Sequence, residues 1–382
     1  MTDVAPRFVQ IHTLSSYPAV LLNRDDAGLA KRLPYGGASR IRVSSQCLKR
    51  HWRTAEDEWA LARIGAPMAV RSREALEREI MPAVVGASAE IVKAIKEAMA
   101  KKLYGEKSVE IRSRQTLLLG RPELAYLARL AQEAAAVSTT AKEAEAAIEA
   151  RLGKGEGKRN LATMKDVAGD LHAGLESALF GRMVTSDTEA NTEAAIHVAH
   201  AFTVHAEESE SDYFTVVDDL RGAETGESGT AGIFETELTS GVFYGYVVVD
   251  VPGLVDNLGG DRDLAGRVVE HLLHLIATVS PGAKRGSTAP YAYADLMLVE
   301  TGNRQPRSLA GAFRKAVPTS GDVFANALDA MRDHLSRLDA AYGGQESRAA
   351  LCCADAPLLP GVKAAWALDA LAGWAASGVR GD

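Results

Sequence analysis

A long helix-forming stretch separates two strand-forming parts of this 382-residue chain, and any fold must accommodate that interruption. From about residue 55 to 180 the sequence is rich in Ala, Glu, Lys and Arg, which are strong helix formers. Apolar residues recur there at helical spacing, as at Ile91, Ile95 and Met99 and along residues 171–179, where Leu stands at every fourth position. We therefore predict a helical insertion.

Strand-like patterns lie on both sides of this stretch. Before it, residues 8–14 (FVQIHTL) are β-branched and aromatic, which is typical of a short buried strand. After it, residues 196–205 alternate with the two-residue period of a strand. Residues 242–249 (VFYGYVVV) and 296–299 (LMLV) are further strand candidates.

Two more helices and a long loop complete the pattern. Apolar residues at helical spacing predict one helix over residues 264–279 and a final one around Trp366 and Trp374. Residues 206–232 are polar and acidic and are expected to form a loop, interrupted by the apolar segment 213–217. This order of elements fits an α+β sheet domain interrupted by helices.

Positive charge is concentrated in one segment of an otherwise acidic chain. Residues 24–53 have a net charge of +6, whereas the whole chain carries −7, so the other 352 residues carry −13. Gly36-Gly37, a predicted sharp turn, and Ser44-Ser45, at a predicted helix start, break the segment, so it is not a single solvated helix face. Such a segment favours binding to a polyanion, because it gathers positive charge where a phosphate backbone can contact it.

Several familiar sites are excluded by their spacing. Residues 153–159 (GKGEGKR) are one residue short of a phosphate-binding loop, and no Ser or Thr follows the Lys to hold magnesium. Cys47, Cys352 and Cys353 are badly spaced for a disulfide framework or a zinc site. We predict no catalytic residue, no metal and no cofactor.

The sequence also favours a cytoplasmic protein. Residues 1–7 lack the basic and apolar parts of a signal peptide. No apolar run approaches the ~18 residues that a membrane span requires. We therefore expect no membrane partner.

Two further features are compatible with RNA binding. Asp25 and Asp26 lie inside the basic segment, where we expect them to pair with Arg24 and Arg32 and to fix its shape. Residues 243–247 (FYGYV) weakly resemble the aromatic strand of single-strand RNA-binding sheets. The same rings are equally compatible with a place in the core.

Several motifs, taken in order, indicate a family. They are residues 23–26 (NRDD), 35–37 (YGG), 42–50 (RVSSQCLKR), 181–186 (GRMVTS), 196–201 (IHVAHA), 214–220 (FTVVDDL), 240–244 (SGVFY) and 281–284 (PGAK). Together they resemble the CasC-type backbone subunit of Cascade, the type I-E CRISPR surveillance complex. The shared order from residue 23 to residue 284 makes this resemblance specific.

The resemblance implies an α+β fold shaped like a hand. A ferredoxin-like (RRM-like) palm would carry a helical finger insertion and a long β-hairpin thumb. On this basis residues 1–59 are the first part of the palm with its basic RNA-binding loop, and residues 60–182 are the fingers. Residues 183–240 are the thumb, and residues 241–382 are the second part of the palm with C-terminal helices.

The resemblance also implies which residues contact RNA. The basic loop and the helix after it would grip the RNA backbone, and three thumb-associated residues would wedge between nucleotides. Arginine forks and hydroxyl or amide groups suit phosphates and 2′-hydroxyls, because they bind the backbone without reading base edges. The predicted RNA-binding residues are Arg24, Lys31, Arg40, Arg42, Ser44, Gln46, Lys49, Arg50, Arg53, Met183, Phe214 and Thr215.

The implied partners belong to one ribonucleoprotein complex of antiviral defence. Several copies of the chain would stack head to tail along a CRISPR RNA, which a heterologous interface allows. The large subunit, the small subunit and two further RAMP-type subunits would complete the complex. The guide, kinked at regular intervals, would be presented to a target DNA strand.

Two other functions stay open at this point. Backbone subunits of type III effector complexes resemble this family distantly and cut RNA with an aspartate in a corresponding loop. Asp25 or Asp26 could therefore support an aspartate-dependent and metal-dependent endoribonuclease. The third possibility is a generic single-strand RNA-binding protein outside any complex.

Two segments depart from the family pattern. The predicted thumb is acidic, with Glu207, Glu208 and Asp212 among its residues, so we expect its tip to face a neighbouring subunit or solvent. The linker at residues 153–159 is a local addition, and its cations are candidates for contact with target DNA.

Overall fold

The computed structural model describes residues 5–105, 110–217, 230–355 and 357–382. Contacts divide the chain into two compact units, which are described separately. Unit 1 comprises Met1–Leu61, Val198–Val248 and Val268–Asp382, and unit 2 comprises Ala62–His197 and Val249–Arg267. Within the described residues, no helix has the length and apolar character needed to cross a membrane.

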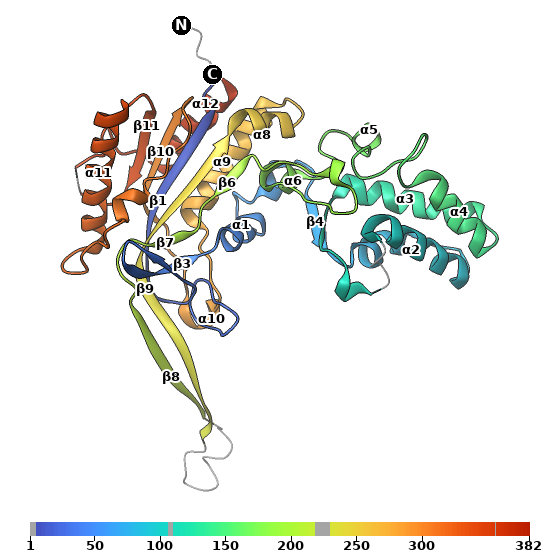
Figure 1. Ribbon diagram of the computed structural model, residues 1–382, viewed down its shortest axis with the longest axis horizontal. Helices are drawn as coiled ribbons and strands as arrows, with labels where there is room; N and C mark the ends of the chain where they lie inside the picture. The colour runs from blue at the N-terminus through green and yellow to red at the C-terminus, as the bar shows by residue number, and fades with distance from the viewer. Residues whose placement is uncertain (1–4, 106–109, 218–229, 356) are drawn as a thin grey trace. The chain divides into compact units, whose positions relative to one another are not determined.

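A mixed α+β arrangement with an antiparallel sheet forms unit 1. The strands follow the order β11-β10-β1-β9-β7-β3-β2, and β8 pairs with β9 (Figure 1). Pairing is antiparallel for β10 with β1 and β11, for β3 with β2 and β7, and for β9 with β7 and β8. The strands are β1 (Phe8–Val20), β2 (Arg32–Tyr35), β3 (Ala38–Val43), β7 (Ala201–Thr203), β8 (Ser209–Val217), β9 (Thr230–Asp250), β10 (Ala294–Gly302) and β11 (Ser347–Cys352).

Helices pack against this sheet and bury its apolar side chains. Leu14 of β1, Tyr244 of β9 and Leu298 of β10 share one buried cluster with Phe313 and Met331 from the helical segments. Burial of each such side chain contributes about 1.5–3 kcal/mol to the free energy of unfolding. The helices are α1 (Ser45–Arg53), α9 (Arg262–Thr278), α10 (Arg285–Thr288), the 3₁₀ helix η7 (Ala310–Phe313), α11 (Val323–Tyr342) and α12 (Leu368–Arg380).

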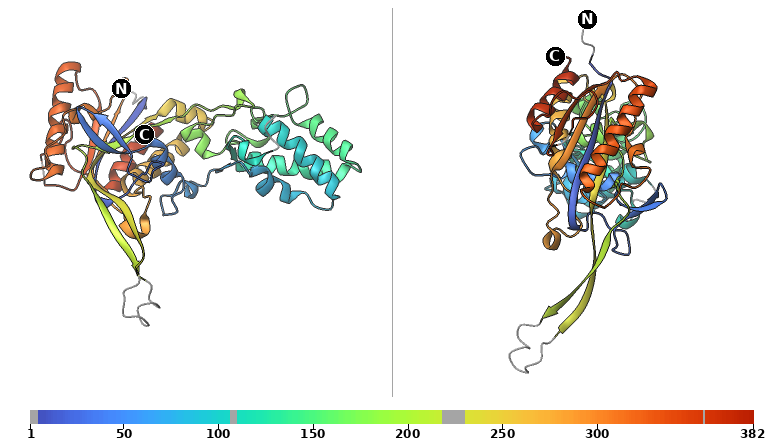
Figure 2. Two further views of the ribbon diagram at one scale, coloured as in Figure 1. Left: turned by 60° about the horizontal axis from the view of Figure 1, so that its bottom comes forward. Right: turned by 90° about the vertical axis from the view of Figure 1, so that its left-hand side faces the viewer.

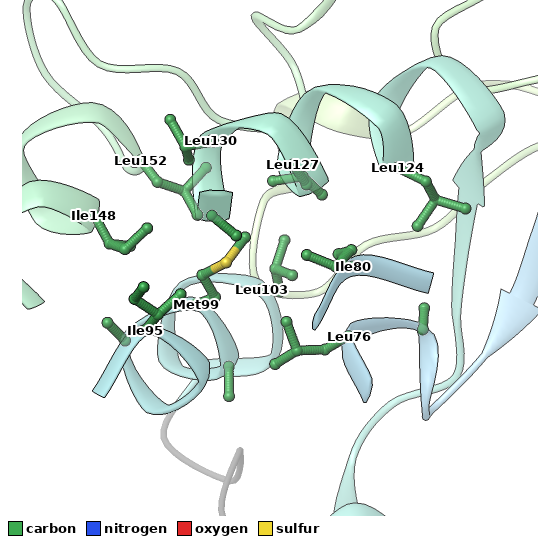
Figure 3. Close-up of a cluster of buried hydrophobic side chains, with 14 of the residues drawn as sticks. Leu76, Ile80, Ile95, Met99, Leu103, Leu124, Leu127, Leu130, Ile148 and Leu152 are labelled. Atoms are coloured by element: carbon green, nitrogen blue, oxygen red, sulfur yellow. The ribbon is translucent and has the colours of Figure 1, made fainter. Parts of the chain in front are cut away.

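Unit 2 is mainly helical and has a core of its own. Leu76, Ile95, Met99, Leu127 and Ile148 converge from four helices into one buried apolar cluster (Figure 3). Its helices are η1 (Leu61–Ile64), η2 (Leu76–Ile80), η3 (Met81–Ala83), α2 (Ala89–Tyr104), η5 (Ile111–Ser113), α3 (Arg121–Val137), α4 (Ala141–Arg151), α5 (Lys165–Ala168), α6 (Leu175–Phe180), η6 (Thr188–Ala190) and α8 (Val251–Asn257). Its strands are β4 (Ala69–Ser72), β5 (Leu117–Gly120) and β6 (Ile196–Val198).

A long two-stranded hairpin extends from the sheet of unit 1. Strands β8 and β9 pair from Ser209↔Thr239 at the root to Val217↔Thr230 at the far end of the described part. Figure 2 shows both strands running away from the other strands of the sheet. The root lies where β9 continues into the sheet beside β7.

Several sequence predictions are confirmed. The expected strands at residues 8–14, 242–249 and 296–299 lie within β1, β9 and β10, and the helix expected over residues 264–279 is α9. The expected sharp turn connects β2 to β3, where Gly36 and Gly37 have φ of 62° and 82°. Two consecutive residues with positive φ are the requirement of a tight hairpin turn, which explains the glycine pair.

Other predictions are wrong in identifiable ways. The helical pattern along residues 171–179 overreaches, because α6 begins only at Leu175. The expected strand at residues 196–205 is broken into β6 and β7. The segment 206–232, expected as a loop interrupted by residues 213–217, contains β8 and the start of β9, and its residues 218–229 lie outside the described part of the chain. Both hairpin strands carry polar side chains on exposed faces, so the alternation of apolar and polar residues that predicts a half-buried strand is weak there.

Candidate nucleic-acid interface

The basic segment begins with a loop that its own backbone and Asp25 hold in shape. Asp25 Oδ1 accepts hydrogen bonds from the backbone N–H groups of Ala27 (2.9 Å) and Leu29 (3.0 Å). Arg24 pairs with Ala30 as an isolated antiparallel bridge. The side chain of Arg24 is exposed at this loop. The loop is therefore ordered by local hydrogen bonds and presents a cation to solvent.

Helix α1 follows and supplies more of the predicted residues. The Ser44 side chain accepts a hydrogen bond from the Cys47 N–H (3.3 Å) and caps the helix, as Ser does at helix N-termini. Gln46 and Arg50 are exposed one helical turn apart, so they share a face. The remaining predicted residues of the helix, Lys49 and Arg53, are half-buried.

Cations from other elements gather around this helix. Arg42 of β3 lies 3.0 Å (Nη1) from His200 Nδ1. Burial lowers the pKa of His200, and the charges of Arg42 and Lys31 lower it further. These interactions place Lys31 and Arg42 beside one imidazole.

A second histidine links α1 to α10. Burial lowers the pKa of His51, although its hydrogen bond to the Cys47 carbonyl opposes the shift, and Arg285 and Arg50 lower it further. Arg285, the first residue of α10, is therefore close enough to α1 to extend its positive charge. We call Arg24, Lys31, Arg42, Arg50 and Arg285 the cationic surface.

Arg40, which the sequence grouped with the RNA-binding cations, lies inside the sheet. Its side chain is fully buried. Its guanidinium donates hydrogen bonds to the carbonyls of Thr203 (2.9 Å), His205 (3.3 Å) and Phe313 (3.0 Å). Arg40 thus joins β3 to β7 and to the end of η7.

The ion pairs of Arg32 differ from those expected from the sequence. Arg32 does not pair with Asp25 or Asp26 but forms ion pairs with Glu207 and Glu237 at the root of the hairpin. Asp25 instead fixes the loop through backbone N–H groups, as described above. The prediction that the aspartates shape the loop is correct for Asp25, and the predicted partner is wrong.

The described part of the hairpin carries exposed aromatic and apolar side chains beyond its root. Phe214 is 41% exposed and Phe234, directly opposite it in the register, is 50% exposed. Their rings stack with centroids 5.6 Å apart. Lys284 Nζ lies 5.5 Å from the Phe214 ring centroid, and Lys284 also bonds Thr236. A cation over an aromatic ring is a favourable interaction, so the contact stabilises the position of the hairpin strand β8 against the segment before α10.

The other two predicted wedge residues are also exposed. Thr215 follows Phe214 on β8. Met183 is 69% exposed and belongs to unit 2, where its carbonyl accepts a hydrogen bond from the Gln115 side-chain amide (3.1 Å). The structure thus places Thr215 beside Phe214, and Met183 on the other unit.

The aromatic strand at residues 243–247 serves the core. Phe243 and Tyr244 are buried, and the Tyr244 hydroxyl accepts a hydrogen bond from the Leu309 N–H (2.9 Å). Tyr246 is half-buried and donates to Gln10 Oε1 (2.9 Å). Of the two interpretations of this strand, the structure supports the core.

Sequence reasoning missed three residues of the interface. Phe234 lies between the loop expected over residues 206–232 and the strand expected over residues 242–249, so no predicted element included it. Arg285 lies far along the chain from the basic segment, and Lys284 was part of a family motif only. The one available signal was the basic pair Lys284-Arg285, which follows the predicted helix at residues 264–279.

Comparisons with known proteins identify the family of the chain and solved structures with a similar fold. The chain matches the sequence model of a family described as "CT1975-like protein" over residues 9–373. A solved chain titled "CRISPR RNA-guided surveillance complex, pre-nicking" is 27% identical, with a TM-score of 0.78, and the match covers 96% of this chain and 100% of that chain.

A second solved chain has a similar fold. It is titled "CRISPR RNA-guided surveillance complex", is 21% identical with a TM-score of 0.59, and the match covers 96% of this chain and 99% of that chain. No curated protein matches. Because the family model spans most of its length, the chain belongs to the CT1975-like family, the CasC-type backbone subunits of type I-E Cascade.

Proposed function

We propose that this backbone subunit of the type I-E CRISPR RNA-guided surveillance complex holds the CRISPR RNA by its phosphates along the cationic surface. The observation that carries the proposal is that Lys31 of the loop, Arg42 of β3 and Arg285 of α10 gather near α1, which itself carries Arg50. Cations gathered in one place on an acidic chain create a local positive potential that attracts a polyanion.

The same surface suits a protein that must accept any guide sequence. Guanidinium and ammonium groups bind phosphate oxygens, whereas sequence is read at base edges. A subunit that leaves base edges free allows Watson–Crick pairing to carry the specificity. Binding through phosphates also predicts that affinity falls steeply as salt rises.

The hairpin formed by β8 and β9 supplies the second contact. We assign the stacked pair Phe214 and Phe234, with Thr215, to a wedge that enters between nucleotides of the RNA on a neighbouring copy. We assign Met183, which is exposed on unit 2, to a separate contact of the same kind with the RNA. An apolar wedge costs a few kcal/mol of unstacking per step and fixes where the RNA is kinked.

In this proposal the parts of the chain correspond to a hand. Residues 1–59 and 241–382 are a ferredoxin-like (RRM-like) palm, residues 60–182 are helical fingers, and residues 183–240 are the thumb. The separate core of unit 2 supports a helical finger insertion, which in the structure extends past residue 182 to include Val184 and Ala190, and the hairpin of unit 1 supports the thumb. Copies stack head to tail along the guide, which requires a heterologous interface that propagates as a helix.

The wider assembly follows from the family. We propose that the large, the small and two further RAMP-type subunits complete the complex, in the cytoplasm, and that the guide pairs with a target DNA strand. The cations of the linker at residues 153–159 remain candidates for contact with that strand.

We further propose that the subunit is not a nuclease. Asp25 Oδ1 already accepts two backbone hydrogen bonds, so this oxygen serves the loop. Asp26 is exposed and is the better position for a test. An Asp26→Ala variant should bind the guide unchanged and show the same RNA fragments as the wild type with Mg²⁺ added, whereas loss of a metal-dependent cleavage would establish the endoribonuclease alternative.

Charge reversal on the surface tests the binding proposal. The full chain is co-expressed with its sibling subunits and a CRISPR array, purified, and assayed for bound guide RNA. Arg24→Glu together with Arg50→Glu should abolish RNA retention, because both residues are exposed members of the cationic surface.

The matched control is Arg337→Glu together with Lys363→Glu. Both residues are exposed and lie outside the cationic surface, and the pair makes the same change in net charge. This control should retain RNA at the wild-type level. If both double variants retain the same amount of guide RNA, the cationic surface does not bind the RNA.

A further inference from the structure

Two carboxylates and one guanidinium form a bracket at the root of the hairpin. Arg32 Nε donates a hydrogen bond to Glu207 Oε2 (2.8 Å), and Arg32 Nη2 pairs with Glu237 Oε1. Glu207 precedes β8, Glu237 lies on β9, and Arg32 opens β2. The bracket therefore joins both sides of the hairpin root to the strand that follows the RNA-binding loop.

The same bracket also holds the end of that loop. Glu237 Oε2 accepts a hydrogen bond from the Ala30 N–H (2.6 Å), and Arg32 Nη1 donates to the Ala30 carbonyl (3.0 Å). Both backbone polar groups of Ala30 are thus bound by the bracket. Ala30 is paired directly with Arg24, an exposed member of the cationic surface.

Neighbouring hydrogen bonds strengthen the root. Ser39 Oγ donates to Glu207 Oε2 (2.7 Å), and Thr239 Oγ1 donates to the Val20 carbonyl (2.9 Å). Ser240 Oγ accepts from the Ala19 N–H (2.9 Å). The root of β9 is therefore attached to β1 as well as to the loop.

The charge of the bracket is unfavourable for RNA binding by itself. Two carboxylates against one guanidinium leave a net charge of −1 beside a surface that would bind phosphates, and Glu237 is only 8% exposed. Repulsion between this charge and a bound phosphate weakens binding. The buried carboxylate of Glu237 is therefore explained by its hydrogen bonds to Arg32 and to the Ala30 N–H, and not by RNA binding.

We infer that Arg32, Glu207 and Glu237 are positioning residues that fix the RNA-binding loop and the hairpin wedge in one register. The inference rests on the proposed function. Phe234 is three residues from Glu237 along β9, which is roughly 10 Å at about 3.4 Å per residue. The bracket thus sets the spacing between the phosphate held at Arg24 and the wedge at Phe214 and Phe234.

Two variants separate positioning from simple electrostatics. Glu237→Gln removes a negative charge near the RNA, so electrostatics alone predicts tighter binding. Arg32→Lys keeps the charge but loses the planar fork that reaches both carboxylates and Ala30, so electrostatics alone predicts no change. Positioning predicts weaker binding in both variants, by about tenfold, because the loop and the wedge lose their common attachment.

The matched control is Glu235→Gln, which removes the same charge from an exposed position on the same strand. Its RNA affinity should stay within about threefold of the wild type. Dissociation constants are measured on the full chain with guide RNA at two salt concentrations. Chemical probing of the guide in the assembled complex reports the wedge, and we expect the regular pattern of altered nucleotides to blur in both bracket variants but not in the control.

The possible results are distinguishable. Wild-type affinity and a wild-type probing pattern in Arg32→Lys, or tighter binding by Glu237→Gln, overturns the inference. If Glu237→Gln fails to fold in a thermal unfolding scan, Arg32→Lys decides alone. Absence of RNA binding by the wild-type chain, or retention of RNA by Arg24→Glu with Arg50→Glu, contradicts the proposed function itself.

Discussion

Replacing Arg40 should destabilise the fold and leave RNA contacts intact, although this residue lies within the basic segment. Arg40→Met keeps an unbranched side chain of similar length and removes the guanidinium. The fully buried guanidinium contacts three backbone carbonyls and no phosphate could reach it without unfolding. The variant therefore tests whether position in the fold, and not charge in the sequence, decides the role of a cation.

The expected cost follows from the individual hydrogen bonds. The His205 carbonyl keeps a donor, because the Thr203 hydroxyl also bonds it at 3.1 Å. The carbonyls of Thr203 and Phe313 lose a charged donor, worth about 1.5–3 kcal/mol each. Arg40 Nε has no hydrogen-bond partner within the described residues, so removing it recovers about 1–3 kcal/mol. We expect the free energy of unfolding of unit 1 to fall by about 3 kcal/mol.

Tryptophan fluorescence can follow this change in unit 1 alone. All four tryptophans, Trp52, Trp59, Trp366 and Trp374, lie in unit 1. For a unit of this size, 3 kcal/mol lowers the urea midpoint by roughly 1 M. At temperatures where the variant is folded, its RNA affinity should show the wild-type salt dependence.

Arg50→Met is the matched opposite case. Arg50 is exposed, so its replacement should leave the urea midpoint unchanged. It should reduce the slope of log affinity against log salt by about 0.7, the value for one phosphate contact on a single strand. An unchanged midpoint in Arg40→Met, or a reduced salt slope there, would refute the reasoning.

Two further predictions concern other parts of the chain. Glu123 and Arg182 form a buried ion pair in unit 2 (2.7 Å), so Glu123→Ala should cost about 3–5 kcal/mol, seen as early loss of helical circular dichroism before the tryptophan signal changes. Burial and nearby cations hold the pKa values of His51 and His200 below the ordinary value, so both are neutral at pH 7. Phosphates favour the protonated forms, and RNA affinity should therefore rise as pH falls below about 6.5, less so in His51→Gln with His200→Gln, as binding titrations would show.

Local patterns in the sequence predicted the parts of the fold that depend on local chemistry. The cap at Ser44, the glycine turn between β2 and β3 and the buried strand β1 each follow from residues close together in the chain. The hairpin did not, because its strands are stabilised by pairing with each other while the described side chains of β8 and those of Phe234 and Glu235 on β9 face solvent. Leu171 shows the opposite error, since apolar spacing alone does not mark where α6 begins.

The candidate site was predictable only as a charge pattern. Eight cations in one segment indicated a polyanion, but burial assigns them different tasks: Arg40 supports the sheet, Arg32 holds the hairpin root, and Arg50 is exposed. Contacts between residues far apart in the sequence determine which role each cation has, and a local sequence pattern does not show such contacts. The same holds for Phe234 and Arg285, which join the site from elsewhere in the chain.

Chemical probing of the guide inside the purified complex tests the central claim most directly. If the subunit holds phosphates and leaves the bases free, the Watson–Crick faces of the guide should react along its length, whatever the spacer sequence. Nucleotides with altered reactivity should recur at regular intervals, and the intervals should be the same for two unrelated spacers. Protection of base faces, or a pattern that follows base identity, would contradict the account.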